Sequence, residues 1–226
     1  MFLSILIPVY NEERTLLNLL QTVLQNLPPQ TEVIVVNDAS TDQSVTILQE
    51  FQTRAHILHQ PTNKGKGAAI RRGLEVARGR YVLIQDADLE YSPTDYPNLL
   101  QPLYEGKADI VYGSRFLKHG RRGSYLTFYI ANRFLTCLTN LCTGLKLTDM
   151  ETCYKVLPLE ALKALDLKEN GFGIEPEITC RLARHTSLRF LEVPIQYMSR
   201  THSEGKKIKW RDGFKAVYQI LKYSFF

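Results

Sequence analysis

The sequence has 226 residues, of which 44% are hydrophobic and 23% charged, and this composition predicts a single folded domain over residues 1–226. The net charge of +5 is small. The four cysteines form no CxxC pair and no metal-ligand spacing with the five histidines, which argues against a disulfide scaffold or a zinc finger and favours reduced thiols in the cytoplasm. No run of about 18 apolar residues occurs, so we expect no segment to span a membrane.

Strands and helices alternate through the first half of the chain. We expect strands at Leu3–Val9, Glu32–Asn37, Ala55–His59, Arg80–Gln85 and Asp109–Tyr112, and helices at Glu12–Asn26, Asp42–Thr53, Lys66–Arg78 and Thr94–Glu105. The first of these helices carries leucines at helical spacing, which is typical of a side that faces the core. Strand–helix alternation predicts an α/β fold with a mainly parallel sheet that helices cover on both faces.

The second half is less regular. A basic loop at Gly120–Gly123 is followed by predicted elements at Tyr125–Cys142 (helix), Asp149–Leu157 (strand), Glu175–His185 (helix), Leu188–Tyr197 (strand) and Arg211–Phe226 (helix). The apolar side of the 125–142 helix consists of Leu126, Ile130, Phe134, Leu138 and Leu141. This stripe fits two roles: packing against the core or a second subunit, or lying in a membrane interface beside Arg121, Arg122 and Arg133.

The most informative segment is Gln85–Glu90, with the sequence QDADLE. Asp86 and Asp88 follow a buried strand at alternate positions, and such a strand delivers them to the edge where open α/β sheets bind ligands. Carboxylates this close together repel one another unless a cation lies between them, and Mg²⁺ or Mn²⁺ suits oxygen ligands of this kind. The alternative is a polar loop or a helix cap, since aspartate is common in both.

Polar residues also follow two other predicted strands. Asp38 follows the second strand, where it could accept hydrogen bonds from a base or a ribose, and Tyr10 follows the first strand and offers an aromatic face. The segment Asn63–Ile70 has the glycines of a tight turn that enters a helix. It predicts either a generic phosphate-binding turn or close helix packing at Gly67.

These motifs together resemble the family 2 glycosyltransferases, which have the GT-A fold. The resemblance rests on PVYNE, VNDASTD, NKGKGAAIRRG and DADLE, and GSRF, TDMETCYKV and RTHSEGKK are similar to the branch of dolichol-phosphate mannosyltransferase and related polyprenyl-phosphate glycosyltransferases. It implies a nucleotide-sugar-binding half at about residues 1–115 and an acceptor-binding half at about 116–226. It also implies a metal-dependent inverting enzyme that moves a hexose from a GDP-mannose or UDP-glucose type of donor to a dolichyl or undecaprenyl phosphate.

The resemblance assigns roles residue by residue. Nucleotide-sugar binding falls to Pro8, Tyr10, Glu12, Asp38, Lys64, Asp86, Ala87, Asp88, Arg115, Arg200, Lys206 and Lys207. The residues assigned to bind the divalent cation are Asp86, Asp88 and Glu90, although mannosyltransferases often have glutamine at the position of Glu90. The residues assigned to bind the acceptor phosphate are Arg115, Arg133 and Arg200. The residues assigned to catalysis are Asp88, Arg115 and Asp149.

The acceptor can also be argued from chemistry. Family members that glycosylate a sugar hydroxyl often carry a QxxRW segment, which this chain lacks. A phosphate monoester, by contrast, is already largely a dianion at neutral pH. Such an acceptor needs positioning more than it needs a base. Two basic clusters fit this need: Arg115, Lys118, Arg121, Arg122 and Arg133, and Arg200, Lys206, Lys207, Lys209 and Arg211. Asp149 and Glu151 remain candidate bases for a hydroxyl acceptor.

Three alternatives therefore stay open. They are a family 2 enzyme that acts on a saccharide hydroxyl in cell-envelope or exopolysaccharide synthesis, a non-catalytic nucleotide-sugar-binding subunit, and a nucleotidyltransferase, which the PVYNE and NDAS segments fit poorly. The expected partners are the nucleotide sugar, the polyprenyl phosphate and a membrane surface, with no nucleic acid. Some relatives continue into membrane-spanning helices. We therefore expect peripheral association with the cytoplasmic face of a membrane, through the chain itself, a membrane-embedded partner or a homo-oligomer.

Overall fold

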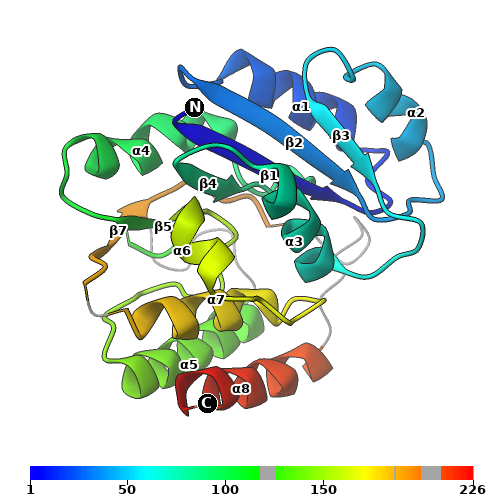
Figure 1. The fold of residues 1–226 in the computed structure, drawn as a ribbon. Helices are drawn as coiled ribbons and strands as arrows, with labels where there is room; N and C mark the ends of the chain where they lie inside the picture. The colour runs from blue at the N-terminus through cyan, green and yellow to red at the C-terminus, as the bar shows by residue number, and fades with distance from the viewer. Residues whose placement is uncertain (118–125, 186, 200–209, 226) are drawn as a thin grey trace.

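Seven strands form one sheet at the centre of the computed structural model, which describes residues 1–117, 126–185, 187–199 and 210–225 (Figure 1). The strand order is β3-β2-β1-β4-β6-β5-β7. The strands are β1 (Leu3–Val9), β2 (Thr31–Asn37), β3 (His56–His59), β4 (Tyr81–Ile84), β5 (Ile110–Ser114), β6 (Lys155–Pro158) and β7 (Phe190–Pro194). Only β6 runs antiparallel to its neighbours β4 and β5, so the predicted mainly parallel sheet is confirmed.

The helices cover the sheet as the alternating pattern predicts. They are α1 (Leu16–Gln25), α2 (Ser44–Gln49), α3 (Lys66–Val76), α4 (Tyr96–Tyr104, preceded by the 3-10 turn η1 at Pro93–Asp95), α5 (Leu126–Thr143), α6 (Leu159–Ala164), α7 (Ile174–Ala183) and α8 (Trp210–Phe225). The predicted leucine stripe of α1 is buried in the core. Helices α5, α7 and α8 pack on one another in a layer below the sheet (Figure 1).

Two strands predicted in the second half are shorter in the structure: 149–157, and 188–197, of which β7 keeps Phe190–Pro194. The predicted strand 149–157 pairs only from Lys155, because residues 149–154 form a loop whose backbone bonds to side chains elsewhere. In that loop, Met150 N donates to Thr136 Oγ1 and Cys153 N donates to Tyr91 Oη. The short helix α6 was not predicted, and the Gly120–Gly123 loop lies outside the described residues.

Helix α5 has an unexpected orientation. Its buried positions are Asn132, Leu135, Thr136 and Thr139, whereas Ile130, Phe134 and Leu141 are 57%, 59% and 80% exposed. The helix therefore packs on α7 and α8 through a different side, and most of the predicted apolar stripe faces outward instead of packing on the core. Within the described residues, no helix is both long enough and apolar enough to cross a membrane.

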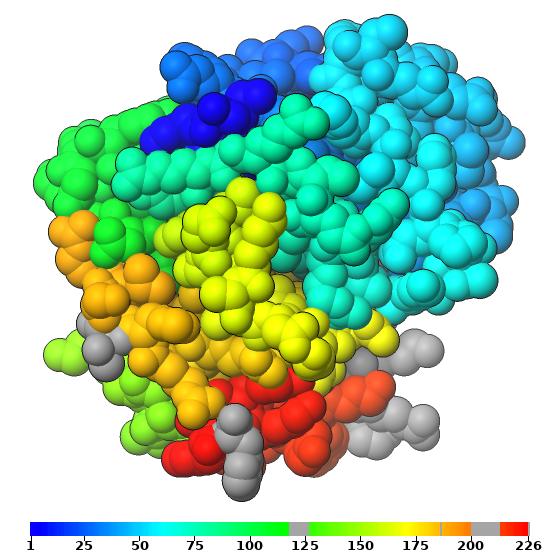
Figure 2. Space-filling model, viewed as in Figure 1, coloured from blue at the N-terminus to red at the C-terminus, as the bar shows by residue number. Residues whose placement is uncertain are grey.

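The loop between α6 and α7 packs against α3 and so connects the second half of the chain to the first. It lies directly against α3 in the space-filling view, and Ala68 N donates to Asn170 O at 3.1 Å (Figure 2). A Cβ atom on Gly67 would lie 2.2 Å from Glu169 O, so only glycine permits this contact. Of the two roles predicted for this segment, close packing at Gly67 is therefore confirmed.

Candidate active site

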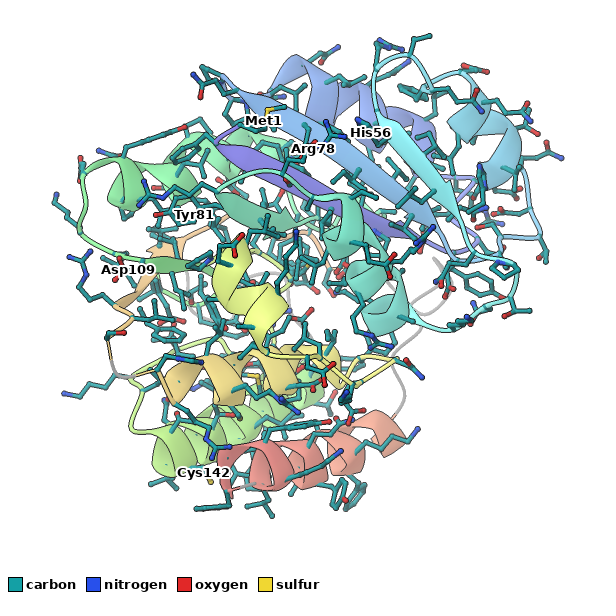
Figure 3. All side chains as sticks on the ribbon, viewed as in Figure 1. Met1, His56, Arg78, Tyr81, Asp109 and Cys142 are labelled. Carbon is teal, nitrogen blue, oxygen red and sulfur yellow. The ribbon has the colours of Figure 1, made fainter. Side chains whose placement is uncertain are left out.

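The candidate site lies where the parallel strands end. Figure 3 labels Met1, Tyr81 and Asp109 at the beginnings of β1, β4 and β5, and the polar loops are at the opposite ends of these strands. Three non-glycine residues with a left-handed backbone lie in these loops: Asn11 after β1, Ala39 after β2 and Leu89 after β4, with φ of 52°, 57° and 62°. Such conformations are costly, and they gather where a surrounding structure holds a functional site in shape.

Side chains fasten the three loops to one another. Asn11 N donates to Ser40 Oγ at 3.0 Å, and Thr41 N donates to Asn11 Oδ1 at 2.8 Å. Thr15 Oγ1 donates to the carbonyl oxygen of Ala87, at 2.8 Å. The structure thus brings the segments that contain Pro8, Tyr10, Glu12, Asp38 and Asp86–Glu90 to one edge of the sheet, as predicted.

Asp38 shapes the loop that enters α3. The residue is only 3% exposed. Its Oδ1 accepts hydrogen bonds from Gln60 Nε2 at 2.7 Å and from Lys64 N at 2.8 Å, and its Oδ2 accepts one from Gly65 N at 2.7 Å. The carboxylate therefore fixes the turn at residues 64–65, which places Lys64 beside it, and its contact with a nucleotide stays a prediction.

The first carboxylate of the acidic motif belongs to a buried ion network. Lys66 Nζ lies 2.7 Å from Asp86 Oδ1 and 3.0 Å from Glu175 Oε1, and Glu175 also pairs with Lys155. Burial by itself would raise the pKa of Asp86, but the charge and hydrogen bond of Lys66, together with the Cys153 thiol and the charge of Lys155, lower it overall. Burial likewise opposes the charge of Lys66, yet the carboxylates hold its pKa well above the ordinary value. Both groups are therefore charged at neutral pH.

Asp88 and Glu90 flank Leu89, the residue with a left-handed backbone in this loop. Glu90 N donates to Asp88 Oδ1 at 3.1 Å, and Tyr197 Oη donates to Glu90 Oε2 at 2.8 Å. Among the described residues, no three histidine, cysteine or carboxylate side chains are grouped closely enough to hold a metal by themselves. Mg²⁺ is usually held by one or two carboxylates together with water and substrate phosphates, so this pair fits such an ion.

Arg115 is held rigidly behind the acidic motif. Its backbone N, Nε and Nη2 donate to the carboxylate of Asp149 at 3.0, 2.7 and 2.7 Å, and Asn132 Nδ2 donates to the same carboxylate at 3.0 Å. The guanidinium lies 5.0 Å from the centre of the Tyr197 ring. Because the four hydrogen bonds use the acceptor capacity of Asp149, this geometry makes Asp149 the group that orients Arg115, and it does not favour Asp149 as a base.

The other predicted phosphate ligands divide into two groups. Arg133 is exposed on α5, and its Nη1 donates to Thr148 O at 3.3 Å, next to Asp149. Arg133 and Arg115 are thereby brought to the same loop. Arg200, Lys206 and Lys207 lie outside the described residues, as do Lys118, Arg121, Arg122 and Lys209.

Sequence reasoning missed four residues around this site: Lys66, Lys155, Glu175 and Tyr197. Lys66 offered a signal, since it lies in the glycine-rich turn before a helix. The sequence pattern places Lys155 and Tyr197 in predicted strands and Glu175 in a predicted helix, and it gives no sign of a role at the site. Their partners are 20 to 109 positions away in the chain, so only the fold brings them to the acidic motif.

Glu151 remains the candidate base for a hydroxyl acceptor. Its Oε1 is buried and has no hydrogen-bond partner in the part of the chain that the structure describes. Burial outweighs the attraction of Lys155 and raises the pKa of Glu151 from 4.5 to about 7. A carboxyl group that titrates near neutrality is suited to accept a proton.

This pKa predicts a pH dependence of stability. The folded protein binds more protons at Glu151 than the unfolded chain between about pH 4.5 and 7, so this group's contribution to stability falls as the pH rises through that window. We expect Glu151→Gln, which is neutral at every pH, to raise the free energy of unfolding at pH 8 by up to about 3 kcal/mol and to leave it nearly unchanged at pH 4. Urea unfolding at both pH values measures the difference. Glu160→Gln, an exposed change on α6, is the control, and equal effects of the two changes would contradict the prediction.

Comparisons with known proteins show the family of this chain. Residues 4–165 match the model of glycosyl transferase family 2. The chain is 34% identical over 216 residues to an undecaprenyl-phosphate mannosyltransferase of Micrococcus luteus, covering 89% of this chain and 85% of that protein. It is 29% identical to the dolichol-phosphate mannosyltransferase of Pyrococcus furiosus, covering 99% of this chain and 65% of that protein.

A solved structure supports the fold. Glucosyl-3-phosphoglycerate synthase from Mycobacterium tuberculosis, in complex with Mn²⁺, uridine diphosphate and glucosyl-3-phosphoglycerate, superposes with a TM-score of 0.73. The match covers 98% of this chain and 78% of that one at 20% identity, and it shows a shared GT-A fold. From the family match, the relatives and the fold together, the chain belongs to glycosyl transferase family 2 and is a glycosyltransferase with the GT-A fold.

Proposed function

We propose that the protein is a metal-dependent inverting glycosyltransferase that moves a hexose from a nucleotide sugar, of the GDP-mannose or UDP-glucose type, to a polyprenyl phosphate. The observation that carries the proposal is the fixed guanidinium of Arg115 beside the acidic motif: the arginine stacks over Tyr197, whose hydroxyl bonds to Glu90. A cation held in place there suits a reaction whose donor and acceptor are both phosphates. The relatives described above carry names of this activity.

The donor side is built from the loops after β1, β2 and β4. Tyr10, Asp38 and Lys64 would surround the nucleotide, and Asp88 and Glu90 would hold Mg²⁺ or Mn²⁺ with Asp86 beside them. When bound, the ion neutralises charge on the departing diphosphate. The buried pair of Lys66 and Asp86 keeps the motif rigid, so that these carboxylates need little rearrangement during the reaction.

The acceptor side needs a cation more than a base. A phosphate oxygen of the acceptor would attack the anomeric carbon opposite the bond to the donor diphosphate; the new carbon–oxygen bond forms as the old one breaks, and the nucleoside diphosphate leaves. The attacking phosphate is largely dianionic at neutral pH, so no proton has to be removed. Arg115, with its fork fixed by Asp149, and Arg133 would orient that phosphate.

The outward face of α5 and α8, which we call the apolar face, supports a membrane-bound acceptor. Exposed apolar side chains follow helical spacing on both helices: Ile130, Phe134, Leu141, Phe214, Tyr218, Leu221 and Phe225. The helices lie side by side, and among their described side chains none is acidic, whereas Arg133, Lys215 and Lys222 are basic. An apolar stripe whose described charged neighbours are basic fits the cytoplasmic surface of a bilayer, whose lipid headgroups are anionic.

Vesicle flotation tests this face. We expect the wild-type chain to float with vesicles that contain anionic lipid, and we expect Phe134→Glu combined with Phe214→Glu to abolish flotation, because two carboxylates would enter the interface. Tyr104→Glu, a change of an exposed aromatic residue on α4, is the matched control and should float like the wild type. Flotation of the double variant at the wild-type level would reject the membrane role of the face.

A transfer assay tests the reaction. The protein is incubated with Mn²⁺, labelled GDP-mannose or UDP-glucose, and either polyprenyl phosphate or saccharide acceptors. Label that moves into the organic phase supports the proposal. Label found only on a saccharide would favour the hydroxyl acceptor with Glu151 as its base, and donor binding without turnover would favour a non-catalytic binding subunit.

A further inference from the structure

Tyr197 lies between the acidic motif and Arg115. Its hydroxyl donates to Glu90 Oε2 at 2.8 Å, while the guanidinium of Arg115 lies over its ring at 5.0 Å from the ring centre. The backbone is fastened at the same place, since Tyr197 forms an antiparallel bridge with Tyr91 and Met198 N donates to Glu90 O at 3.0 Å. One residue thus touches both a predicted metal ligand and the predicted phosphate-binding arginine.

The two contacts use different parts of the side chain. The phenol proton bonds to one carboxylate oxygen, which limits how far the Glu90 carboxylate can rotate. The ring face attracts the arginine and packs beside Tyr91, with ring centres 5.3 Å apart. Carboxylates that bind metals are commonly held by such outer hydrogen bonds, and losing one typically lowers metal affinity by about 10 to 100-fold.

We propose that Tyr197 is a positioning residue for the metal site: its hydroxyl sets the orientation in which Glu90 meets a divalent cation, and its ring holds Arg115 alongside. This inference rests on the donor half of the proposed function and does not depend on which acceptor is used. It also assigns a role to the segment after β7, where the sequence pattern predicted only a strand.

Mn²⁺ binding tests the hydroxyl without any turnover. In the presence of UDP or GDP, free Mn²⁺ is measured by electron paramagnetic resonance for the wild type, Tyr197→Phe, Glu90→Ala and the double variant. We expect Tyr197→Phe to weaken Mn²⁺ binding by about 10 to 100-fold, and we expect the double variant to bind no more weakly than Glu90→Ala, because the hydroxyl acts through that carboxylate. Wild-type affinity in Tyr197→Phe, or additive losses in the double variant, would overturn the proposal.

Two further variants separate positioning from general stability. Tyr91→Phe removes a neighbouring hydroxyl that accepts a hydrogen bond from Cys153 N, so we expect it to lower the melting temperature but not the Mn²⁺ affinity. Tyr197→Leu removes the ring as well as the hydroxyl. We expect it to weaken Mn²⁺ binding and also to raise the KM for the donor or the acceptor. If Tyr197→Phe itself lowers the melting temperature, the comparison of Glu90→Ala with the double variant still decides the question.

The outcome also separates this inference from the proposed reaction. Tyr197-dependent Mn²⁺ binding without transfer to polyprenyl phosphate would overturn the proposed acceptor alone. Transfer to polyprenyl phosphate with Mn²⁺ affinity that is independent of Tyr197 would overturn the positioning role alone.

Discussion

Replacing Asp88 by asparagine is expected to lower sugar transfer by at least about a hundredfold and to leave the fold intact. The change removes one negative charge at the place where the diphosphate and its cation would bind, and the loss of one such electrostatic partner typically costs about 3 kcal/mol in the transition state. Asp88 is partly exposed, and an asparagine Oδ1 can still accept the hydrogen bond from Glu90 N, so the melting temperature should change little. Transfer rates at saturating Mn²⁺ and thermal unfolding measure the two effects.

Asp86→Asn and Asp166→Asn provide the comparison. Asp86 is paired with the buried Lys66, so its replacement should lower the melting temperature as well as the rate. The side chain of Asp166 is 79% exposed and pairs with Lys168 at the surface, so its replacement should alter neither quantity. A wild-type rate for Asp88→Asn would remove Asp88 from the metal site.

Replacing Asp149 by alanine should cost both stability and activity. The carboxylate is completely buried and is the partner of Arg115, whose side chain is only 13% exposed, so its loss leaves a buried charge uncompensated. Breaking such a pair typically costs about 3 to 5 kcal/mol, or roughly 6 to 20 °C in melting temperature for a chain of this size. Sugar transfer should fall as well, because the guanidinium of Arg115 loses its fixed orientation.

A double variant separates these two effects. In Arg115→Met with Asp149→Leu, both charges of this pair are removed, so neither is left buried without its partner; much of the lost stability should return while transfer stays low. Asp109→Ala is the control, because it removes the partner of Arg189 in an ion pair at the surface, where we expect a cost below about 1 kcal/mol. Recovery of transfer in the double variant would show that Arg115 does not contact the phosphates.

The sequence predicted the structure of about residues 1–115 well. Runs of β-branched residues, helical stripes and the polar residues after each strand are local signals. They predicted the parallel sheet, the order of its first elements and the edge at which Asp38 and Asp86–Glu90 gather. The family motifs lie mostly in the same segments, which is why the fold and the enzyme class followed from them.

Which side of α5 is buried became clear only from the three-dimensional structure. The apolar stripe of α5 suggested either an inward or an outward face, and the structure turns most of it outward because Asn132 and Thr136 are needed inside, where Asn132 bonds to Asp149 and Thr136 bonds to Asn132. The partners of Asp86 and Glu90, which are Lys66 and Tyr197, also come from other segments of the chain. Hydrogen bonds and ion pairs between residues far apart in the chain leave no periodic pattern in the sequence, whereas burial within a single strand or helix does.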